Sequence, residues 1–166
     1  MIDLEKIRKQ HPYETQYEFI ISQLVISAGT KRVFEIGTGL YTFSQIILSA
    51  LEQTGGTLYT CDPAPLGEFQ HPQMVKYIKT SDEMAETWNM PIDILMIDGD
   101  HNYPQVKRDF ENFWPYLRQG GYCIFHDIAV EHPEYVKKLW LELKPTHKVQ
   151  VEELQYPGLG VLQKKW

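Results

Sequence analysis

The chain has 166 residues, a length that suits one domain with a sizeable hydrophobic core. Its formal net charge of −6 and ordinary hydrophobic content of 43% argue against a general binder of nucleic acids or membrane surfaces. Neither a transmembrane stretch nor the apolar core of a signal peptide is evident. Cys61 and Cys123 lie in short apolar runs and do not form a disulfide framework, so we expect a reduced, cytoplasmic environment.

The first part of the chain alternates between helical and extended patterns. A polar opening segment is expected to be helical and to break at His11-Pro12-Tyr13. Apolar residues at helical spacing predict a helix over residues 15–27, which Gly29 would end. A strand over 31–36, a helix over 42–51, a strand over 57–61 and a third strand over 74–78 follow. Ser81 is expected to cap a short helix that comes next.

Two short apolar runs in the second half of the chain each end in polar residues. Residues 92–97 stop at Asp98, and residues 122–125 stop at His126 and Asp127. Residues 106–117 between them place their apolar side chains on one helical face. A strand, a crossover helix and a strand form a right-handed unit in which both strands point the same way. We therefore expect Asp98, Asp100, His101, His126 and Asp127 around one crevice, where open α/β sheets bind ligands.

The remaining elements complete the prediction of the fold. A helix is expected over residues 133–143, followed by an antiparallel pair over 147–154 and 159–164 that turns at Pro157-Gly158. The alternation of strands and helices predicts an α/β fold with a doubly wound, mostly parallel sheet and an antiparallel edge. No repeat or linker divides the chain, so we predict a single domain over 1–166, with residues 1–30 as a helical cap.

The turn after the first strand reads Glu35-Ile36-Gly37-Thr38-Gly39. Two glycines allow a tight turn and a close approach to a ligand. Thr42 occupies the position of the third glycine of a dinucleotide fingerprint, and Glu35 suits a cationic ligand better than a pyrophosphate. Asp62 ends the second strand, about where a ribose-binding acid belongs. The glycines could equally serve the turn alone.

These motifs resemble a known family. Glu35 to Gly39 with Asp62, together with the closing stretch 158–162, resembles the class I S-adenosylmethionine-dependent methyltransferases over nearly the whole chain. The resemblance implies a seven-stranded Rossmann-like sheet of order 3-2-1-4-5-7-6 with strand 7 antiparallel and helices on both faces. The family's third glycine is replaced by Tyr41. The resemblance implies S-adenosylmethionine as the cofactor, bound by Glu35, Gly37, Thr38, Gly39, Asp62, Ser81, Asp82 and Asp98, with Ser81 and Asp82 near the adenine.

The central stretch narrows the resemblance. Residues 97–103, with Gly120-Gly121 and His126-Asp127, are similar to small O-methyltransferases related to macrocin and cephalosporin-type enzymes, and distantly to catechol and caffeoyl-CoA O-methyltransferases. This similarity implies that Asp98, His126 and Asp127 hold a divalent metal such as magnesium or manganese, and that His101 is the general base. The chemistry agrees, because an ordinary hydroxyl becomes a good nucleophile only when a metal or a base lowers the cost of losing its proton.

Other interpretations remain open. Asp98 and Asp100 could cap turns, His126 could be a core histidine, and His101 could be a solvated loop residue. The alternatives are a metal-independent methyltransferase that modifies a nitrogen or an acid, a non-catalytic adenosyl-binding domain that supports a partner, and, ranked lower, a nicotinamide dehydrogenase. No sizeable insertion can form a lid. We therefore expect a small-molecule acceptor, such as a sugar or a secondary metabolite, without a nucleic-acid or membrane partner; a homo-oligomer stays open.

Overall fold

The computed structural model describes residues 2–165, so Met1 and Trp166, the ends of the predicted domain, lie outside the described residues. Helices and strands alternate along the chain, as the sequence predicts. The helices are α1 (Leu4–Gln10), α2 (Pro12–Thr15), α3 (Glu18–Ser27), α4 (Thr42–Thr54), α5 (Ser81–Ala85), α6 (Tyr103–Phe113), the 3₁₀ turn η1 (Trp114–Tyr116) and α7 (Val136–Leu143). The strands are β1 (Arg32–Ile36), β2 (Thr57–Cys61), β3 (Met74–Tyr77), β4 (Ile92–Ile97), β5 (Leu117–His126), β6 (Lys148–Glu153) and β7 (Leu159–Gln163).

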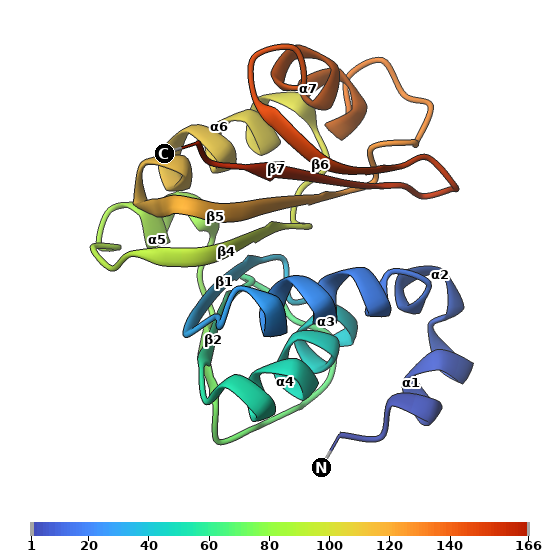
Figure 1. The fold of residues 1–166 in the computed structure, drawn as a ribbon, viewed down its shortest axis with the longest axis vertical. Helices are drawn as coiled ribbons and strands as arrows, with labels where there is room; N and C mark the ends of the chain where they lie inside the picture. Colours follow the sequence, from blue (N-terminus) through green and yellow to red (C-terminus); the bar gives the residue numbers. More distant parts are fainter. Residues whose placement is uncertain (1, 166) are drawn as a thin grey trace.

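The seven strands form one twisted sheet of order β3-β2-β1-β4-β5-β7-β6 (Figure 1). Neighbouring strands from β3 to β5 pair in parallel, whereas β7 runs antiparallel to both β5 and β6. The predicted doubly wound sheet with its antiparallel strand 7 is therefore confirmed. Because β1, β2, β4 and β5 are parallel, their carboxyl ends meet at one edge of the sheet, where ligands of such folds bind.

Helices cover both faces of the sheet and give the molecule two hydrophobic cores. In Figure 1, α3 and α4 lie beside β1 and β2 and below β4, whereas α6 and α7 lie above β5 and β7. Side chains of a parallel strand alternate between the faces, so Val33 packs in the core under α3 and α4, and Phe34 packs in the core with α6 and α7. The last helix, α7, contributes to the core on the α6 side of the sheet, where Val136, Leu139 and Trp140 are buried.

Two glycines permit close approaches that a side chain would block. Gly37 follows β1 with a φ of 91°, and a Cβ there would lie 2.1 Å from the backbone oxygen of Asp98. Gly160 in β7 faces α7, and its Cβ would lie 2.6 Å from the ring of Trp140. The first contact brings the ends of β1 and β4 together at the ligand-binding edge.

Four predicted helices have other boundaries. The helix expected over 42–51 continues to Thr54, where Gly55 caps it. The helix expected over 15–27 begins at Glu18, because Pro12 starts the separate short helix α2. Tyr17 lies between the two helices as the N-cap of α3 and does not have helical backbone angles. The helix expected over 106–117 ends at Phe113, since Pro115 has no N–H with which to continue it, and Leu117 is already the first residue of β5. The helix expected over 133–143 begins only at Val136.

The expected cap at Ser81 is also wrong. Thr80 is the N-cap of α5, and it forms a capping box in which its hydroxyl accepts from the Glu83 N–H while the Glu83 carboxylate accepts from the Thr80 N–H. Ser81 is the first helical residue, and its hydroxyl is free to bond elsewhere.

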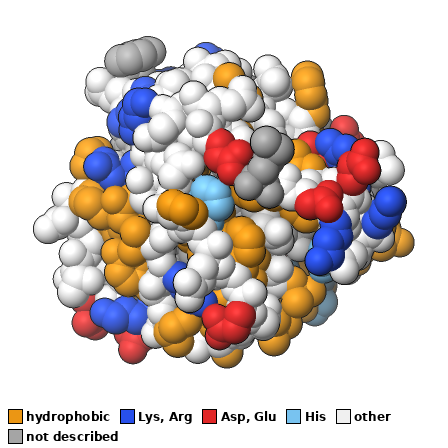
Figure 2. All heavy atoms as spheres, turned by 90° about the horizontal axis from the view of Figure 1, so that it is seen from below, with side chains coloured by type: hydrophobic (Ala, Val, Ile, Leu, Met, Phe, Trp, Pro, Cys, Tyr) orange, Lys and Arg blue, Asp and Glu red, His pale blue; other side chains and the backbone are white. Residues whose placement is uncertain are grey.

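The surface has mixed character. Figure 2 shows small groups of acidic and basic side chains next to one another, with hydrophobic side chains between them. In the part of the chain that the structure describes, no helix combines the length and the apolar character that crossing a membrane requires.

Candidate functional site

A cavity of about 970 Å³ opens at the carboxyl ends of β1, β2, β4 and β5. The loops after these strands line it, as the topology requires. It brings together all but one of the site residues expected from the sequence. These are Gly37, Thr38, Gly39, Asp62, Ser81, Asp82, Asp98, His101, His126 and Asp127.

Glu35 is the exception, because it does not belong to the cavity lining. Its side chain points to the α4 face of the sheet, is 1% exposed, and accepts a hydrogen bond of 2.5 Å from the Ser44 hydroxyl. Burial raises the pKa of Glu35 to about 8, although Ser44 and Thr60 oppose the shift. The alternation of side chains along β1 explains the placement, since Ile36 faces the cavity and Glu35 faces the other way.

The glycine loop is held by Asp62. One carboxylate oxygen accepts hydrogen bonds from the N–H groups of Thr38 (3.1 Å) and Gly39 (2.9 Å), and the other accepts from the N–H of Ala64 (2.8 Å). A carboxylate offers about four acceptor positions; the glycine loop occupies two of them and the Ala64 N–H a third. Asp62 therefore both positions the loop and keeps room for a further donor.

Tyr41 replaces the family's third glycine, and it adopts the backbone conformation that a glycine would favour. Its φ is 62°, in the left-handed region, and its side chain is 2% exposed. The ring packs against Phe69, and the hydroxyl is 3.1 Å from the Lys76 ammonium. These contacts offset the strain of about 1 kcal/mol that a non-glycine residue pays there.

Asp109 was not expected at the site, yet it supports the loop beside the cavity. It is fully buried in α6, and its carboxylate accepts hydrogen bonds from Ser81 Oγ (2.6 Å) and Gln105 Nε2 (2.9 Å). Burial raises the pKa of Asp109. A charged residue at a buried position of a helix was the available signal, because such a group is rarely buried without a partner.

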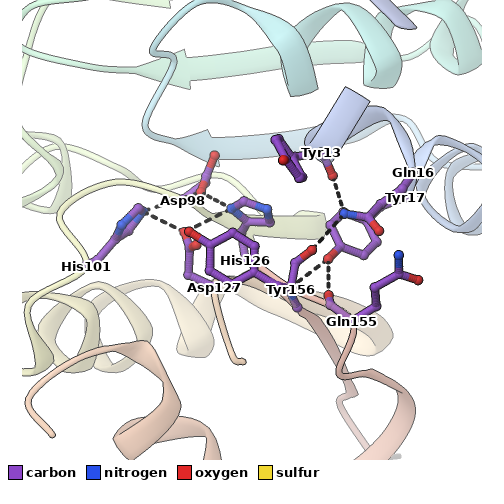
Figure 3. A network of polar contacts seen from close by, with 10 residues as sticks. Tyr13, Gln16, Tyr17, Asp98, His101, His126, Asp127, Gln155 and Tyr156 are labelled. Carbon is purple, nitrogen blue, oxygen red and sulfur yellow. Dashed lines mark hydrogen bonds and ion pairs between the residues drawn. The ribbon is translucent and has the colours of Figure 1, made fainter. Parts of the chain in front are cut away.

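Two aspartates and two histidines meet at the ends of β4 and β5 (Figure 3). The His126 Nδ1 lies 2.9 Å from an Asp98 oxygen and 3.0 Å from an Asp127 oxygen. The His101 Nε2 lies 3.1 Å from the same Asp127 oxygen and 3.5 Å from the same Asp98 oxygen. These contacts of His101 are ion-pair contacts rather than directed hydrogen bonds, because Nε2 has no hydrogen-bond partner.

The contacts change the protonation of this cluster. Burial lowers the pKa of His126, but its contacts with Asp127 and Asp98 outweigh burial and raise the pKa to about 10. Contact with Asp98 also raises the pKa of His101, against the effect of burial. Burial raises the pKa of Asp98, and the two histidines outweigh it and hold that pKa below its usual value. In this arrangement His126 is an imidazolium between two carboxylates at neutral pH.

The local backbone and two aromatic rings orient the cluster. Asp127 has a φ of 63°, which is uncommon for a residue with a side chain and typical of strained functional positions. The His126 ring lies edge-on between Tyr17 and Phe43, with ring centroids 5.8 and 5.0 Å away. The aromatic rings fix the imidazole so that Nδ1 faces both carboxylates.

The N-terminal helices reach the site through Tyr17 and Gln16, neither of which sequence reasoning had singled out as site residues. The Tyr17 hydroxyl donates to the Gln155 carbonyl (2.9 Å) and accepts from the Gly158 N–H (2.7 Å). The Gln16 amide donates to the carbonyls of Tyr13 and Tyr156. These bonds join α2 and α3 to the turn between β6 and β7, as Figure 3 shows.

The donor set of the cluster fits a divalent metal. One atom each from Asp98, His101 and Asp127 lies within 4.8 Å of the others. The His126 contacts of 2.9 and 3.0 Å also match the spacing of about 3 Å between neighbouring ligands of an octahedral ion. Two carboxylate oxygens suit magnesium, whereas imidazole nitrogens favour manganese or zinc.

Comparison with known proteins shows which family model the chain matches. The family model described as "Methyltransferase domain" matches residues 34–128, more than half of the chain. An uncharacterised protein, R132, of Acanthamoeba polyphaga mimivirus is 40% identical over 58 residues, which cover 35% of this chain and 26% of that protein. The match therefore spans about a quarter of the relative's length.

Solved structures share the fold. MycE, a methyltransferase from the mycinamycin biosynthetic pathway in complex with Mg, SAH and mycinamycin VI, aligns with a TM-score of 0.74 and 17% identity over 98% of this chain and 54% of its own. A candidate caffeoyl-CoA O-methyltransferase from Staphylococcus aureus also aligns with a TM-score of 0.74, with 19% identity over 98% of this chain and 92% of its own. At this level of identity the similarity concerns the fold.

Proposed function

The chain belongs to the methyltransferase domain family, and on that premise we propose that it transfers a methyl group from S-adenosylmethionine to a hydroxyl of a small molecule. One observation carries the proposal. A single cavity holds the glycine loop with Asp62 on one side and the cluster of Asp98, His101, His126 and Asp127 on the other. A cofactor site and a proton-accepting site on facing strand ends are what methyl transfer to a hydroxyl requires.

The cofactor supplies an activated methyl group on its positively charged sulfur. We assign the methionine end to Gly37, Thr38 and Gly39, where the two glycines lack side chains and let the backbone approach closely. Asp62 would accept from a ribose hydroxyl, and Ser81 with Asp82 would lie beside the adenine. Glu35, which is buried and bonded to Ser44, would hold α4 against β1 rather than touch the cofactor.

His101 is the proposed general base. Its side chain is 37% exposed at the cavity, while its Nε2 is buried against the Asp98 and Asp127 oxygens without a directed hydrogen bond, so the ring would have to turn for Nε2 to meet an acceptor hydroxyl. The contacts with Asp98 and Asp127 orient the ring and stabilise the proton that it takes up. Because contact with Asp98 raises the pKa of His101, methyl transfer should become faster as the pH rises through that pKa.

A divalent cation held by Asp98 and Asp127, with His126 as third ligand, belongs to the proposal. It would lower the pKa of the acceptor hydroxyl when bound. MycE, which shares this fold, was solved in complex with Mg and SAH, and this supports including a metal in the proposal. The spacing of the carboxylate and imidazole atoms described above supports it as well.

A metal-independent methyltransferase is the second candidate, and the same spacing favours it. His126 Nδ1 already bridges the two carboxylates that would bind the cation. An imidazolium in that position offsets their charge without any ion. Dialysis against a chelator separates the two candidates, because only the metal-independent enzyme would keep its methyl-transfer rate.

Calorimetry tests the cofactor assignment. Wild-type protein should bind S-adenosylmethionine and S-adenosylhomocysteine, and Asp62→Ala should lose at least about 1.5–3 kcal/mol of binding free energy for each ribose hydrogen bond, together with the anchors of the glycine loop. Asp93→Ala is the matched control, since that carboxylate accepts from Lys31 and Arg32 away from the cavity lining. No heat of binding with wild-type protein at high ligand concentration would refute the proposed function.

The acceptor class is the open part of the function. MycE was solved with mycinamycin VI, and the Staphylococcus aureus protein is described as a candidate caffeoyl-CoA O-methyltransferase, so the two neighbours suggest different acceptors. We propose a small secondary metabolite or sugar derivative, and the cavity itself narrows this choice.

A further inference from the structure

We propose that the methyl acceptor carries no negative charge and that it enters the cavity along the exposed pair of Tyr13 and Tyr156. The inference rests on the proposed methyl transfer at the same cavity and specifies the substrate class of that site. It would exclude phosphorylated acceptors, carboxylates and coenzyme A thioesters. Two features of the cavity support it, namely the sign of its charges and the construction of its mouth.

The first feature is the charge of the lining. Six carboxylates line the cavity, and among the described residues its lining includes neither lysine nor arginine. Against these six carboxylates the described part of the lining offers only the imidazoles of His101 and His126, to which a bound cofactor would add a single positive charge. The carboxylates belong to Glu14, Asp62, Asp82, Asp98, Asp100 and Asp127.

An anionic acceptor would be repelled by these carboxylates and would find no lysine or arginine among the described lining residues to pair with. Phosphate and carboxylate groups are recognised by arginine forks, lysine or backbone N–H groups. Asp62 already occupies the N–H groups of Thr38 and Gly39. A cleft lined by charges of one sign also raises the local concentration of the opposite sign and lowers that of its own.

The second feature is an aromatic entrance. Tyr13 in α2 and Tyr156 in the β6–β7 turn are 63% and 64% exposed, and their rings meet edge to face with centroids 6.3 Å apart. Both residues belong to the cavity lining, and Figure 3 shows them beside the His126 and Asp127 end. The Gln16 side-chain amide donates hydrogen bonds to the backbone carbonyls of both tyrosines, and these bonds hold the pair in place.

Exposed tyrosines at a fixed separation offer flat apolar faces to a ring, and Glu14 stands next to Tyr13 in the same helix. Aromatic faces bind neutral rings through their apolar surface and bind cations through their quadrupole, but they give no support to an anion. The tyrosine pair and the acidic lining therefore both favour a neutral or cationic acceptor over an anionic one.

Paramagnetic NMR tests the charge selection without a known acceptor. Isotope-labelled protein saturated with S-adenosylhomocysteine is mixed with a cationic amino-nitroxide or with its anionic carboxy analogue. A negative potential of about kT per unit charge would make the local concentration of the cationic probe about sevenfold higher than that of the anionic one. The ratio is measured from the relaxation of cavity amides such as Gly99, relative to amides of the remote strand β6. The double variant Glu14→Gln, Asp100→Asn should reduce the ratio. Equal relaxation by both probes, or a preference for the anionic one, would overturn the proposal.

Matched ligands test the entrance. Tyramine, 4-hydroxybenzyl alcohol and 4-hydroxyphenylacetate share a hydroxyphenyl group and differ in charge. The first two should bind at least several-fold more tightly than the third, and Tyr13→Ala should weaken their binding whereas Phe19→Ala, which removes an equally exposed ring away from the cavity lining, should not. Tighter binding of the carboxylate would contradict the inference, and if none of the three binds, the nitroxide ratio decides. Calorimetry with S-adenosylmethionine on the same sample shows separately whether the proposed function fails.

Discussion

Removing one hydroxyl group should show how strongly the N-terminal helices are tied to the site. In Tyr17→Phe the ring remains, so its edge-on contact with His126 is kept. The hydroxyl is lost together with the bond that it accepts from the Gly158 N–H and the bond that it donates to the Gln155 carbonyl. The substitution therefore isolates two hydrogen bonds between segments about 140 residues apart.

The expected cost follows from the burial of the two partners. Gly158 is buried, so its N–H would be left without a partner at a cost of about 1–3 kcal/mol. Gln155 is exposed, and water can replace the bond to its carbonyl, which limits that loss to about 0.5–1 kcal/mol. We expect a decrease of about 2–3 kcal/mol in the free energy of unfolding, which corresponds to about 5–10 °C in Tm for a chain of this length.

Urea denaturation followed by far-ultraviolet circular dichroism measures this change. Tyr13→Phe is the matched control, because the Tyr13 side chain is largely exposed and its hydroxyl makes no hydrogen bond within the described residues. The control should lie within about 0.5 kcal/mol of wild type. A Tyr17→Phe variant that is as stable as the control would show that water satisfies Gly158 and would refute the reasoning.

The remaining predictions concern the site cluster and the buried acid. If Asp98 and Asp127 hold a cation, manganese or magnesium should raise the Tm of chelator-treated protein, and Asp98→Asn should abolish the gain; a wild-type Tm that both metals leave unchanged would reject the metal. His101→Gln should lower turnover by about 10²–10⁴-fold while calorimetry shows nearly unchanged cofactor affinity, and near-normal turnover would exclude His101 as the base. Glu35 has a folded-state pKa raised to about 8, so between its unfolded value of 4.5 and about pH 8 the unfolded chain binds fewer protons and the free energy of unfolding falls as the pH rises. Glu35→Gln should remove this part of the slope in denaturation curves measured from pH 5 to 8, and an identical slope would show that the carboxylate is solvated.

The sequence by itself was sufficient for the order of the elements and for the edge of the sheet that carries the site. Both follow from local signals. Short apolar runs that end in Asp98 and in His126-Asp127 mark buried strands and their carboxyl ends, and the parallel connection between them places those ends side by side. Gly37 belonged to a recognisable turn, and the structure adds the backbone of Asp98 as the reason why a side chain is not tolerated there.

Boundaries within an element were less predictable, because they depend on single hydrogen bonds. Thr80 and Ser81 are both good caps by composition, and the reciprocal bonds with Glu83 decided for Thr80. Glu35 belonged to the correct motif, but the twist of β1 and the alternation of its side chains turned it towards Ser44 and away from the cavity.

Only the tertiary structure decided which distant residues complete the site. Tyr17 meets Gly158, and Ser81 meets Asp109. Periodicity along a chain reports which face of an element is buried, but it does not contain the distance between elements far apart in sequence. That distance is set by how the helices pack on the twisted sheet, and the roles of Tyr17 and Asp109 became visible only there.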